Sequence, residues 1–128
     1  MKKTAAQLVD EAMQQVKTLS VQEAIALHGR DDTQFVDIRD VRELKREGAV
    51  PGAMHAPRGM LEFWVDPTCV YHRDAFAADK HFVLFCAAGW RSALATKTVQ
   101  EMGLENVSHI DGGFKAWKES GGPVESKD

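Results

Sequence analysis

The sequence predicts an α/β fold in which a small parallel β-sheet is flanked by helices on both faces. Three short apolar runs, at residues 34–38, 82–85 and 107–110, have the length and the aromatic or branched side chains of buried strands. The segments between and after these runs carry apolar residues at helical spacing. Strands that alternate with helices along a chain favour parallel pairing, because each helix returns the chain across the sheet.

Length, composition and charge indicate a single domain and argue against several classes of function. A chain of 128 residues can form one domain whose core needs neither a disulfide nor a metal. The net charge of −3, without a basic stripe or tail, argues against nucleic-acid binding. Cys69 and Cys86 show neither CxxC spacing nor a zinc-type cluster, so we expect free thiols in a reducing compartment. No apolar stretch reaches the length of a membrane span or a signal-peptide core, and we expect a cytoplasmic protein without membrane association.

Residues 1–30 are expected to form an N-terminal helical extension that packs on the domain formed by residues 31–128. Thr4 and Gln7 fit a capping box at the start of the first helix, and a second box at Ser20 and Glu23 starts a short helix that Gly29 ends. The residues expected on the packed face of the first helix are Leu8, Ala12, Met13 and Val16.

The middle of the chain reads as a strand followed by short, irregular pieces. After the strand at 34–38, Asp40 and Glu43 cap a short helix that Gly48 ends. A turn at 50–53 leads into a brief strand at 54–56 and a helix-like piece at 58–65, and we expect one helical turn near 75–78.

The last third holds the strand at 82–85, a helix that begins at Ser92, and the strand at 107–110. A turn at 111–113 then starts a final helix, in which Phe114 and Trp117 face inward.

Cys86 stands where a parallel strand ends and a glycine-containing loop leads into a helix. Ligand sites of α/β sheets lie at this edge, and the free N–H groups and dipole of a helix N-terminus favour an anion there. A thiolate, the reactive form of cysteine, would be stabilised in that position. The alternative is an inert buried cysteine, and the place of Cys86 at the strand end favours the catalytic interpretation.

Three motifs, in order, resemble those of the rhodanese family, and the resemblance covers about residues 35–125. Cys86 with Gly89, Arg91 and Ser92 is similar to the active-site loop of that family. One departure is Ala49, where the family usually has a histidine in a structural role. The other residues that carry the resemblance are Asp37, Ile38, Arg39 and Glu43 with residues 48–53, then Asp111, Gly112, Gly113 and Trp117 with residues 122–124.

The resemblance implies a sulfurtransferase that works through a persulfide on Cys86. The donor would be a small anion such as thiosulfate and the acceptor cyanide or a thiol, including one carried by a protein; no metal or organic cofactor is needed. The residues expected to cradle the negative terminal sulfur with their N–H groups are Ala87, Ala88, Gly89, Trp90, Arg91 and Ser92.

Several neighbouring side chains have two open roles. Arg91 either holds an anionic donor or pairs with Asp37 or Glu43 and braces the loop, and we favour the brace. Arg58 is either a second anion contact or a solvated side chain. Trp90 forms either an exposed lip of the site or a packing contact with Phe63 or Trp64.

Two other functions fit a cysteine in such a loop. A cysteine phosphatase or arsenate reductase of the same architecture is one, and a non-catalytic binding module is the other. Four residues separate Cys86 from Arg91, whereas cysteine phosphatases have five, so the loop length favours sulfur over phosphate. The presence of Cys86 argues against the non-catalytic module.

Overall fold

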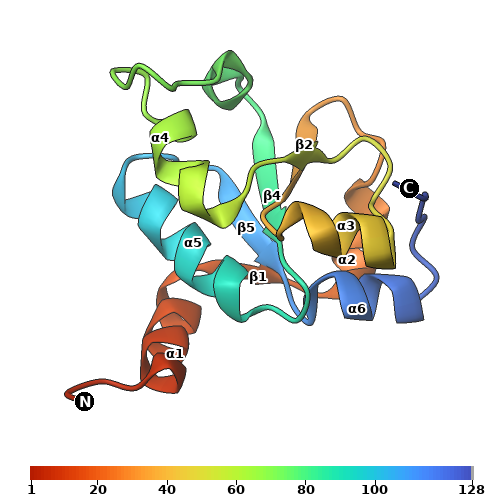
Figure 1. The fold of residues 1–128 in the computed structure, drawn as a ribbon, viewed down its shortest axis with the longest axis horizontal. Helices are drawn as coiled ribbons and strands as arrows, with labels where there is room; N and C mark the ends of the chain where they lie inside the picture. Colours follow the sequence, from red (N-terminus) through yellow and green to blue (C-terminus); the bar gives the residue numbers. More distant parts are fainter. Residues whose placement is uncertain (128) are drawn as a thin grey trace.

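The computed structural model describes residues 1–127 and contains a five-stranded, fully parallel sheet with the order β1-β5-β4-β2-β3 (Figure 1). The strands are β1 (Lys17–Leu19), β2 (Thr33–Asp37), β3 (Met54–His55), β4 (His81–Phe85) and β5 (Val107–Ile110). The α-helices are α1 (Ala5–Gln15), α2 (Val21–Leu27), α3 (Val41–Glu47), α4 (Leu61–Val65), α5 (Trp90–Glu101) and α6 (Gly113–Glu119). Two 3₁₀ turns, η1 (Arg58–Met60) and η2 (Asp74–Ala77), complete the structure.

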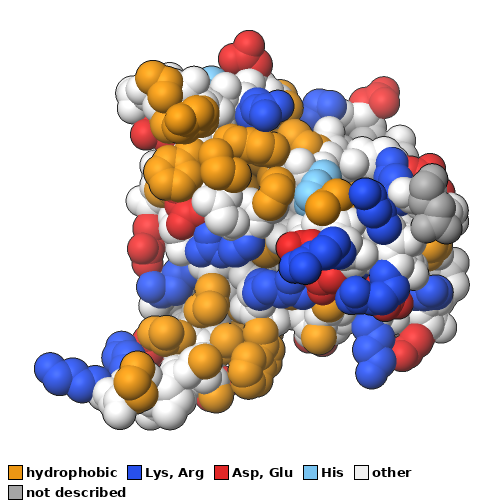
Figure 2. Space-filling model, in the orientation of Figure 1, with side chains coloured by type: hydrophobic (Ala, Val, Ile, Leu, Met, Phe, Trp, Pro, Cys, Tyr) orange, Lys and Arg blue, Asp and Glu red, His pale blue; other side chains and the backbone are white. Residues whose placement is uncertain are grey.

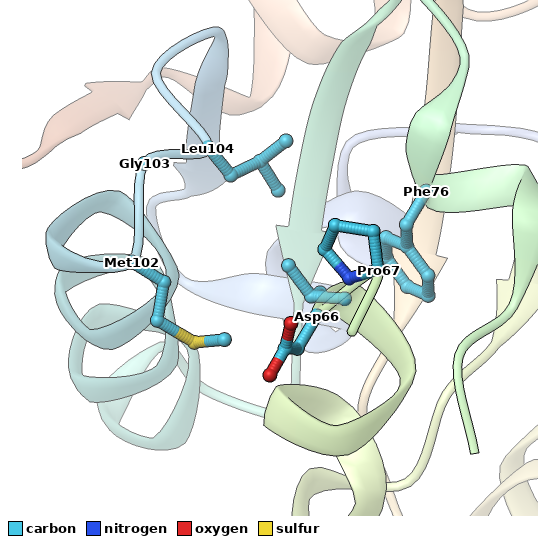
Figure 3. Close-up of a pocket in the computed structure, with 7 residues that line it drawn as sticks. Asp66, Pro67, Phe76, Met102, Gly103 and Leu104 are labelled. Carbon is cyan, nitrogen blue, oxygen red and sulfur yellow. The ribbon is translucent and has the colours of Figure 1, made fainter. Parts of the chain in front are cut away.

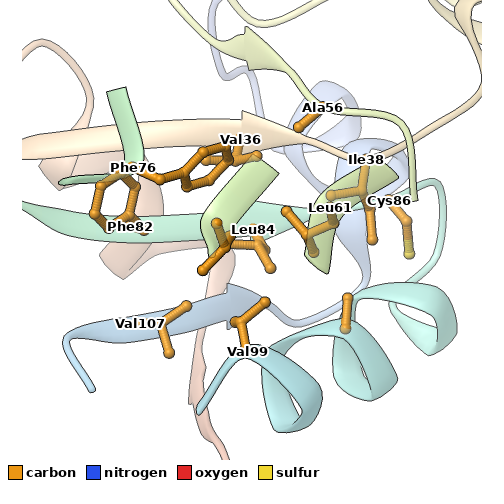
Figure 4. Packing of buried hydrophobic residues seen from close by; sticks show 12 residues of the cluster. Val36, Ile38, Ala56, Leu61, Phe76, Phe82, Leu84, Cys86, Val99 and Val107 are labelled. Carbon is orange, nitrogen blue, oxygen red and sulfur yellow. The ribbon is translucent and has the colours of Figure 1, made fainter. Parts of the chain in front are cut away.

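Helices cover both faces of the sheet, as predicted, and strand β4 shows how the two cores arise. Its side chains alternate, so that Phe82 and Leu84 face the α4–α5 side while Val83 and Phe85 face the α2–α6 side. All four are fully buried, which accounts for the continuous apolar run in the sequence. Cys86 follows Phe82 and Leu84 onto the α4–α5 side and lies at the end of that core (Figure 4).

The N-terminal segment differs from the purely helical extension that we expected. Residues Lys17–Leu19 form the edge strand β1, which pairs in parallel with Ser108–Ile110 of β5. A strand of three residues is too short to show a period in the sequence, and its conformation is stabilised by hydrogen bonds to β5. The predicted packed face of α1 is also partly wrong. Ala12 is buried against α5 as expected, but its buried neighbour is Val9, and Leu8 and Met13 are exposed.

Most local predictions are confirmed. The capping boxes of α1, α2 and α3 all form, with Thr4, Ser20 and Asp40 as the N-caps. The piece at 58–65 divides into η1 and α4, and η2 lies within one residue of the expected helical turn. Helix α5 begins two residues earlier than predicted, at Trp90, because Gly89 acts as its N-cap.

The sheet topology determines what surrounds Cys86. Strands β2 and β4 are neighbours, and the Ile38 N–H donates to the Phe85 carbonyl at 3.0 Å where both strands end. Strand β5 lies on the other side of β4 and leads into α6. The β4–α5 loop is therefore flanked at the carboxyl edge of the sheet by the β2–α3 and β5–α6 connections. Over residues 1–127, no helix has both the length and the apolarity needed to cross a membrane.

Candidate active site

The sulfur of Cys86 is buried and already accepts backbone hydrogen bonds. The N–H groups of Gly89 and Ser92 donate to Cys86 Sγ at 3.2 and 3.4 Å. Ser92 Oγ lies 3.6 Å from the same sulfur, and Cys86 as a whole is 1% exposed. Cys86 therefore lies at the strand end as predicted, with two N–H groups directed at its sulfur.

The N-terminus of α6 binds backbone carbonyls of the loop that follows β4. The N–H of Phe114 donates to the Cys86 carbonyl at 2.8 Å, and the N–H of Lys115 donates to the Ala87 carbonyl at 3.0 Å. Gly113 lies directly against these carbonyls, since a Cβ there would stand 2.8 Å from the Ala87 oxygen and closer still to the Cys86 oxygen. Because the carbonyls turn toward α6, the loop N–H groups can face the other way.

The remaining loop amides make the site suitable for an anion. Trp90 and Arg91 occupy the first turn of α5, where N–H groups have no partner within the helix. Within residues 1–127, the N–H groups of Ala87 and Ala88 donate to no backbone carbonyl. Gly89 adopts a φ of +112°, a conformation that side chains disfavour, and this angle turns the chain from the loop into α5. Of the six predicted loop residues, Gly89 and Ser92 donate their N–H groups to Cys86 Sγ, and a role for the other four in holding an anion stays a prediction.

Arg91 braces the loop through Glu43. Its Nη1 and Nη2 atoms donate to the two Glu43 carboxylate oxygens at 2.8 and 2.9 Å. The hydrogen bonds from Arg91 lower the pKa of Glu43, and those to Glu43 raise the pKa of Arg91. Of the two roles proposed for Arg91, this geometry is that of the brace.

Asp37 does not reach Arg91, so the alternative pairing that we considered is wrong. Its carboxylate is instead bound by Arg39, whose Nη2 donates to Asp37 Oδ2 at 2.8 Å and to the Gly48 carbonyl at 2.8 Å. Both side chains are 1% exposed, and the Arg39 guanidinium lies 4.1 Å from the centre of the Phe114 ring. This buried pair joins β2, α3 and α6 beneath the loop, which agrees with the structural role expected for Asp37.

Arg58, Trp90 and Cys69 have no side-chain hydrogen bond to the Cys86 loop among residues 1–127. Arg58 Nη1 donates to Glu62 at 2.6 Å, within the η1–α4 segment. Trp90 is 58% exposed on the first turn of α5, as expected for an exposed lip. Cys69 lies in the turn after α4, where its sulfur accepts the Tyr71 N–H at 3.4 Å.

Sequence reasoning missed a buried polar chain behind Cys86. His109 on β5 is 1% exposed, with Nδ1 2.9 Å from Ser92 Oγ and Nε2 3.0 Å from Thr18 Oγ1. Burial lowers the pKa of His109, against a smaller opposing effect of Asp111. The sequence could have indicated this position. Side chains alternate along a strand, so His109 lies on the same side of β5 as Val107, and Val107 packs in the same core as Cys86.

Two cavities differ in their relation to the site. One of about 280 Å³ lies between α3 and α6 and reaches Ala87; charged side chains such as Arg46, Lys115 and Glu47 line it. Figure 2 shows charged side chains of both signs gathered over these two helices. A second cavity, of about 480 Å³, is lined by Asp66 and Pro67 after α4 and by residues 102–104 after α5 (Figure 3). It lies at the far end of α5 from the loop.

The model of the rhodanese-like domain matches residues 20–120. The chain belongs to this family. A curated relative, rhodanese-like domain-containing protein 17 of Arabidopsis thaliana, is 31% identical over 98 residues, which are 70% of this chain and 61% of the relative. The family match begins before β2 and includes α2, so α2 lies within the region that the family model describes.

Two solved structures extend the comparison. A protein of unknown function from Rhodopseudomonas palustris, described as a possible tyrosine phosphatase, is 50% identical with a TM-score of 0.95, covering 98% of this chain and 96% of that one. A thiosulfate sulfurtransferase from Pseudomonas aeruginosa has a TM-score of 0.77 at 23% identity, covering 97% of this chain and 23% of that one. The second likeness shows a shared rhodanese fold.

Proposed function

We propose that this rhodanese-like domain is a sulfurtransferase that moves a sulfane sulfur through a persulfide on Cys86. The observation that carries the proposal is the combination of a buried sulfur receiving two amide hydrogen bonds with an arginine already neutralised by Glu43. Such a site stabilises a small anion through backbone dipoles and leaves Arg91 as a brace.

The reaction consists of two displacements. The Cys86 thiolate attacks the outer sulfur of a donor such as thiosulfate, the Sγ–S bond forms, and the donor S–S bond breaks as sulfite leaves with the electron pair. The amides of residues 87–92 then hold the negative terminal sulfur. An acceptor, cyanide or a thiolate, attacks that sulfur, and the electron pair of the breaking Sγ–S bond returns to Cys86. Double displacement of this kind gives ping-pong kinetics and needs no metal.

The proposed reaction requires two partners. The donor is a small anion, and the acceptor is cyanide or a thiol that reaches Cys86 from outside. The cavity of about 280 Å³ beside Ala87 would allow a protein thiol to approach, because it opens between α3 and α6 next to the loop. A protein with reactive free thiols functions in a reducing compartment, which supports a cytoplasmic location.

A phosphatase is the second candidate, because the relative from Rhodopseudomonas palustris is described as a possible tyrosine phosphatase. A cysteine phosphatase needs an arginine free to clamp two phosphate oxygens. Here both terminal nitrogens of Arg91 are bound to Glu43, and the loop is one residue shorter between Cys86 and Arg91 than in that class. Both observations favour sulfur transfer.

Incubation with thiosulfate followed by intact mass spectrometry tests the proposal. We expect the protein to gain the mass of one sulfur atom and to lose it when cyanide is added. Cys86→Ser should abolish this gain and reduce thiocyanate formation at least about a thousandfold, because no nucleophile remains. Cys69→Ser is the matched control and should keep most of the activity.

The competing outcome is equally clear. If the protein hydrolyses p-nitrophenyl phosphate through Cys86 faster than it transfers sulfur, the phosphatase assignment is correct. If Cys86 gains no sulfur from thiosulfate or from a persulfide donor, the sulfurtransferase proposal is wrong.

A further inference from the structure

We propose that His109 is a positioning residue that directs the Ser92 hydroxyl toward the sulfur of Cys86. Four elements meet in this arrangement: Cys86 follows β4, Ser92 lies in the first turn of α5, His109 is on β5 and Thr18 is on β1. The atoms form one chain, from Sγ to Ser92 Oγ at 3.6 Å, to His109 Nδ1 at 2.9 Å, and from Nε2 to Thr18 Oγ1 at 3.0 Å.

The Ser92 hydroxyl has one proton and three neighbouring acceptors. Besides Cys86 Sγ and His109 Nδ1, the Gly89 carbonyl lies 3.2 Å from Ser92 Oγ. If Nδ1 of His109 carries no proton, it is the nearest acceptor and takes the Ser92 proton away from the sulfur. If Nδ1 carries the proton, it donates to Ser92 Oγ, and the hydroxyl can then donate only to the Gly89 carbonyl or to Sγ. The tautomer of His109 therefore decides whether Ser92 can stabilise a thiolate.

Thr18 favours the tautomer with the proton on Nδ1. Its hydroxyl lies 3.0 Å from His109 Nε2 and 3.8 Å from the Met13 thioether, which is a weak acceptor. A hydroxyl that donates to Nε2 leaves the single proton of the neutral ring on Nδ1. In the opposite tautomer, the Thr18 proton would have only the thioether and the Ser92 proton would be lost to the ring. This tautomer removes the nearest acceptor of the Ser92 proton and leaves the Gly89 carbonyl and Cys86 Sγ. Of these two, a negatively charged Sγ is the stronger acceptor.

The direction of the chain matters when charge is on Sγ. In the proposed reaction, on which this role rests, Sγ is negative before it attacks the donor and again when the acceptor removes the outer sulfur. A hydroxyl donor adds to the Gly89 and Ser92 amides at both moments. Two further charged groups interact with members of this chain. Asp111 opposes the lowering of the His109 pKa, and Arg91, paired with Glu43, has its pKa raised in small part by Cys86.

The pH dependence of Cys86 alkylation tests the inference without using sulfur transfer. In a Cys69→Ser background Cys86 is the only thiol, since the chain has two cysteines. The measured quantity is the iodoacetamide rate near pH 6 divided by the plateau rate that each variant reaches at high pH. Differences in access to the thiol cancel in this ratio. We expect His109→Leu and Ser92→Ala to lower the ratio about tenfold, because one hydrogen bond to the thiolate is lost.

Three further variants separate positioning from packing. His109→Asn places an amide donor where Nδ1 stands and should keep the ratio within about twofold of the parent. Thr18→Val should lower it about threefold, since the tautomer is then no longer selected. His81→Leu is the matched control, because His81 Nε2 lies 2.7 Å from Ser108 Oγ, in a similar pair at the opposite end of β4, and it should change nothing.

The outcomes are distinct. An unchanged ratio in His109→Leu or in Ser92→Ala would overturn the inference, and so would an equal loss in His109→Asn and His109→Leu, because the effect would then come from ring packing. If His109→Leu does not fold, Ser92→Ala and Thr18→Val still decide the question. Failure of the protein to gain sulfur from both thiosulfate and a persulfide donor would refute the proposed function while leaving this alkylation result intact.

Discussion

At the scale of single residues, Glu43 connects the start of α3 with Arg91 of the loop after Cys86, which lies 48 residues further along the chain. One carboxylate oxygen accepts the Asp40 N–H at 2.8 Å and closes the capping box of α3, while both oxygens hold Arg91. The ion pair is only partly buried, with Arg91 at 42% exposure, so its electrostatic strength is limited. Its two-pronged geometry, more than its energy, makes it suitable for orienting the loop.

Glu43→Gln tests the brace directly. The amide oxygen of glutamine can still cap α3, but the charge and one of the two hydrogen bonds to Arg91 are lost. We expect kcat for thiosulfate to fall about fivefold with KM nearly unchanged, because the loop loses its orientation while the donor contacts remain. Steady-state kinetics with cyanide as acceptor measure both constants. A lower KM for thiosulfate would contradict the brace, since it would mean that the freed guanidinium binds the donor; Glu47→Gln, on the same helix, is the control.

At the scale of elements, the N-terminus of α6 shapes the active-site loop. Its first-turn N–H groups take up the Cys86 and Ala87 carbonyls, and Gly113 allows the two backbones to touch. The loop after Cys86 is therefore held by two helices: it leads into the first turn of α5, and its carbonyls are bound by the N-terminus of α6. This close approach explains the glycine at position 113.

Gly113→Ala should damage both stability and sulfur transfer. A methyl group there would clash with the Cys86 carbonyl and stand 2.8 Å from the Ala87 oxygen, and φ is +59°. We expect the free energy of unfolding to fall by about 3 kcal/mol and persulfide formation to slow, because the loop must shift. Urea unfolding and the thiosulfate assay measure the two effects.

Gly121→Ala is the matched control for this substitution. Its φ is also positive, at +83°, but no atom lies within 4 Å of the added methyl group. It should cost only about 1 kcal/mol and leave the rate of persulfide formation unchanged. Equal effects of the two substitutions would mean that backbone strain, and not the close approach to Cys86, explains Gly113.

At the scale of the whole molecule, the sheet carries one buried and one half-buried histidine, His109 and His81, whose titration couples to folding. Burial lowers the pKa of His109 and of His81 below the ordinary value of 6.5. Below that pH the unfolded chain binds protons that the folded chain does not, so the free energy of unfolding decreases as the pH falls. The stability contributed by the neutral rings is complete above 6.5 and is lost as the pH falls toward the lowered pKa values.

Thermal unfolding between about pH 7.5 and pH 5 should show this loss. We expect Tm to fall by several degrees over the interval, because a change of about 1 kcal/mol moves Tm by roughly 3 to 6 °C in a domain of this size. His109→Asn cannot titrate and should show a smaller decrease. An equal or steeper decrease in His109→Asn would mean that the pH dependence arises from other groups.

The sequence by itself determined the features that depend on neighbours in the chain. The continuous apolar run of β4, the three capping boxes and the glycine-containing loop after Cys86 are all local, so they predicted a strand, three helix starts and a loop that leads into a helix. Tertiary structure alone decided the others: the three-residue strand β1, the pairing of Asp37 with Arg39, and the contact of Ser92 with His109. The strand and the Ser92–His109 contact depend on which strands lie side by side and in what register.

The Asp37–Arg39 pair spans only two residues, but Arg39 also binds Gly48 and stacks on Phe114, so the fold selects that partner over Arg91. A buried polar side chain needs a hydrogen-bond partner, and in these cases the partner comes from a distant segment. A local sequence pattern therefore cannot predict which partner it is.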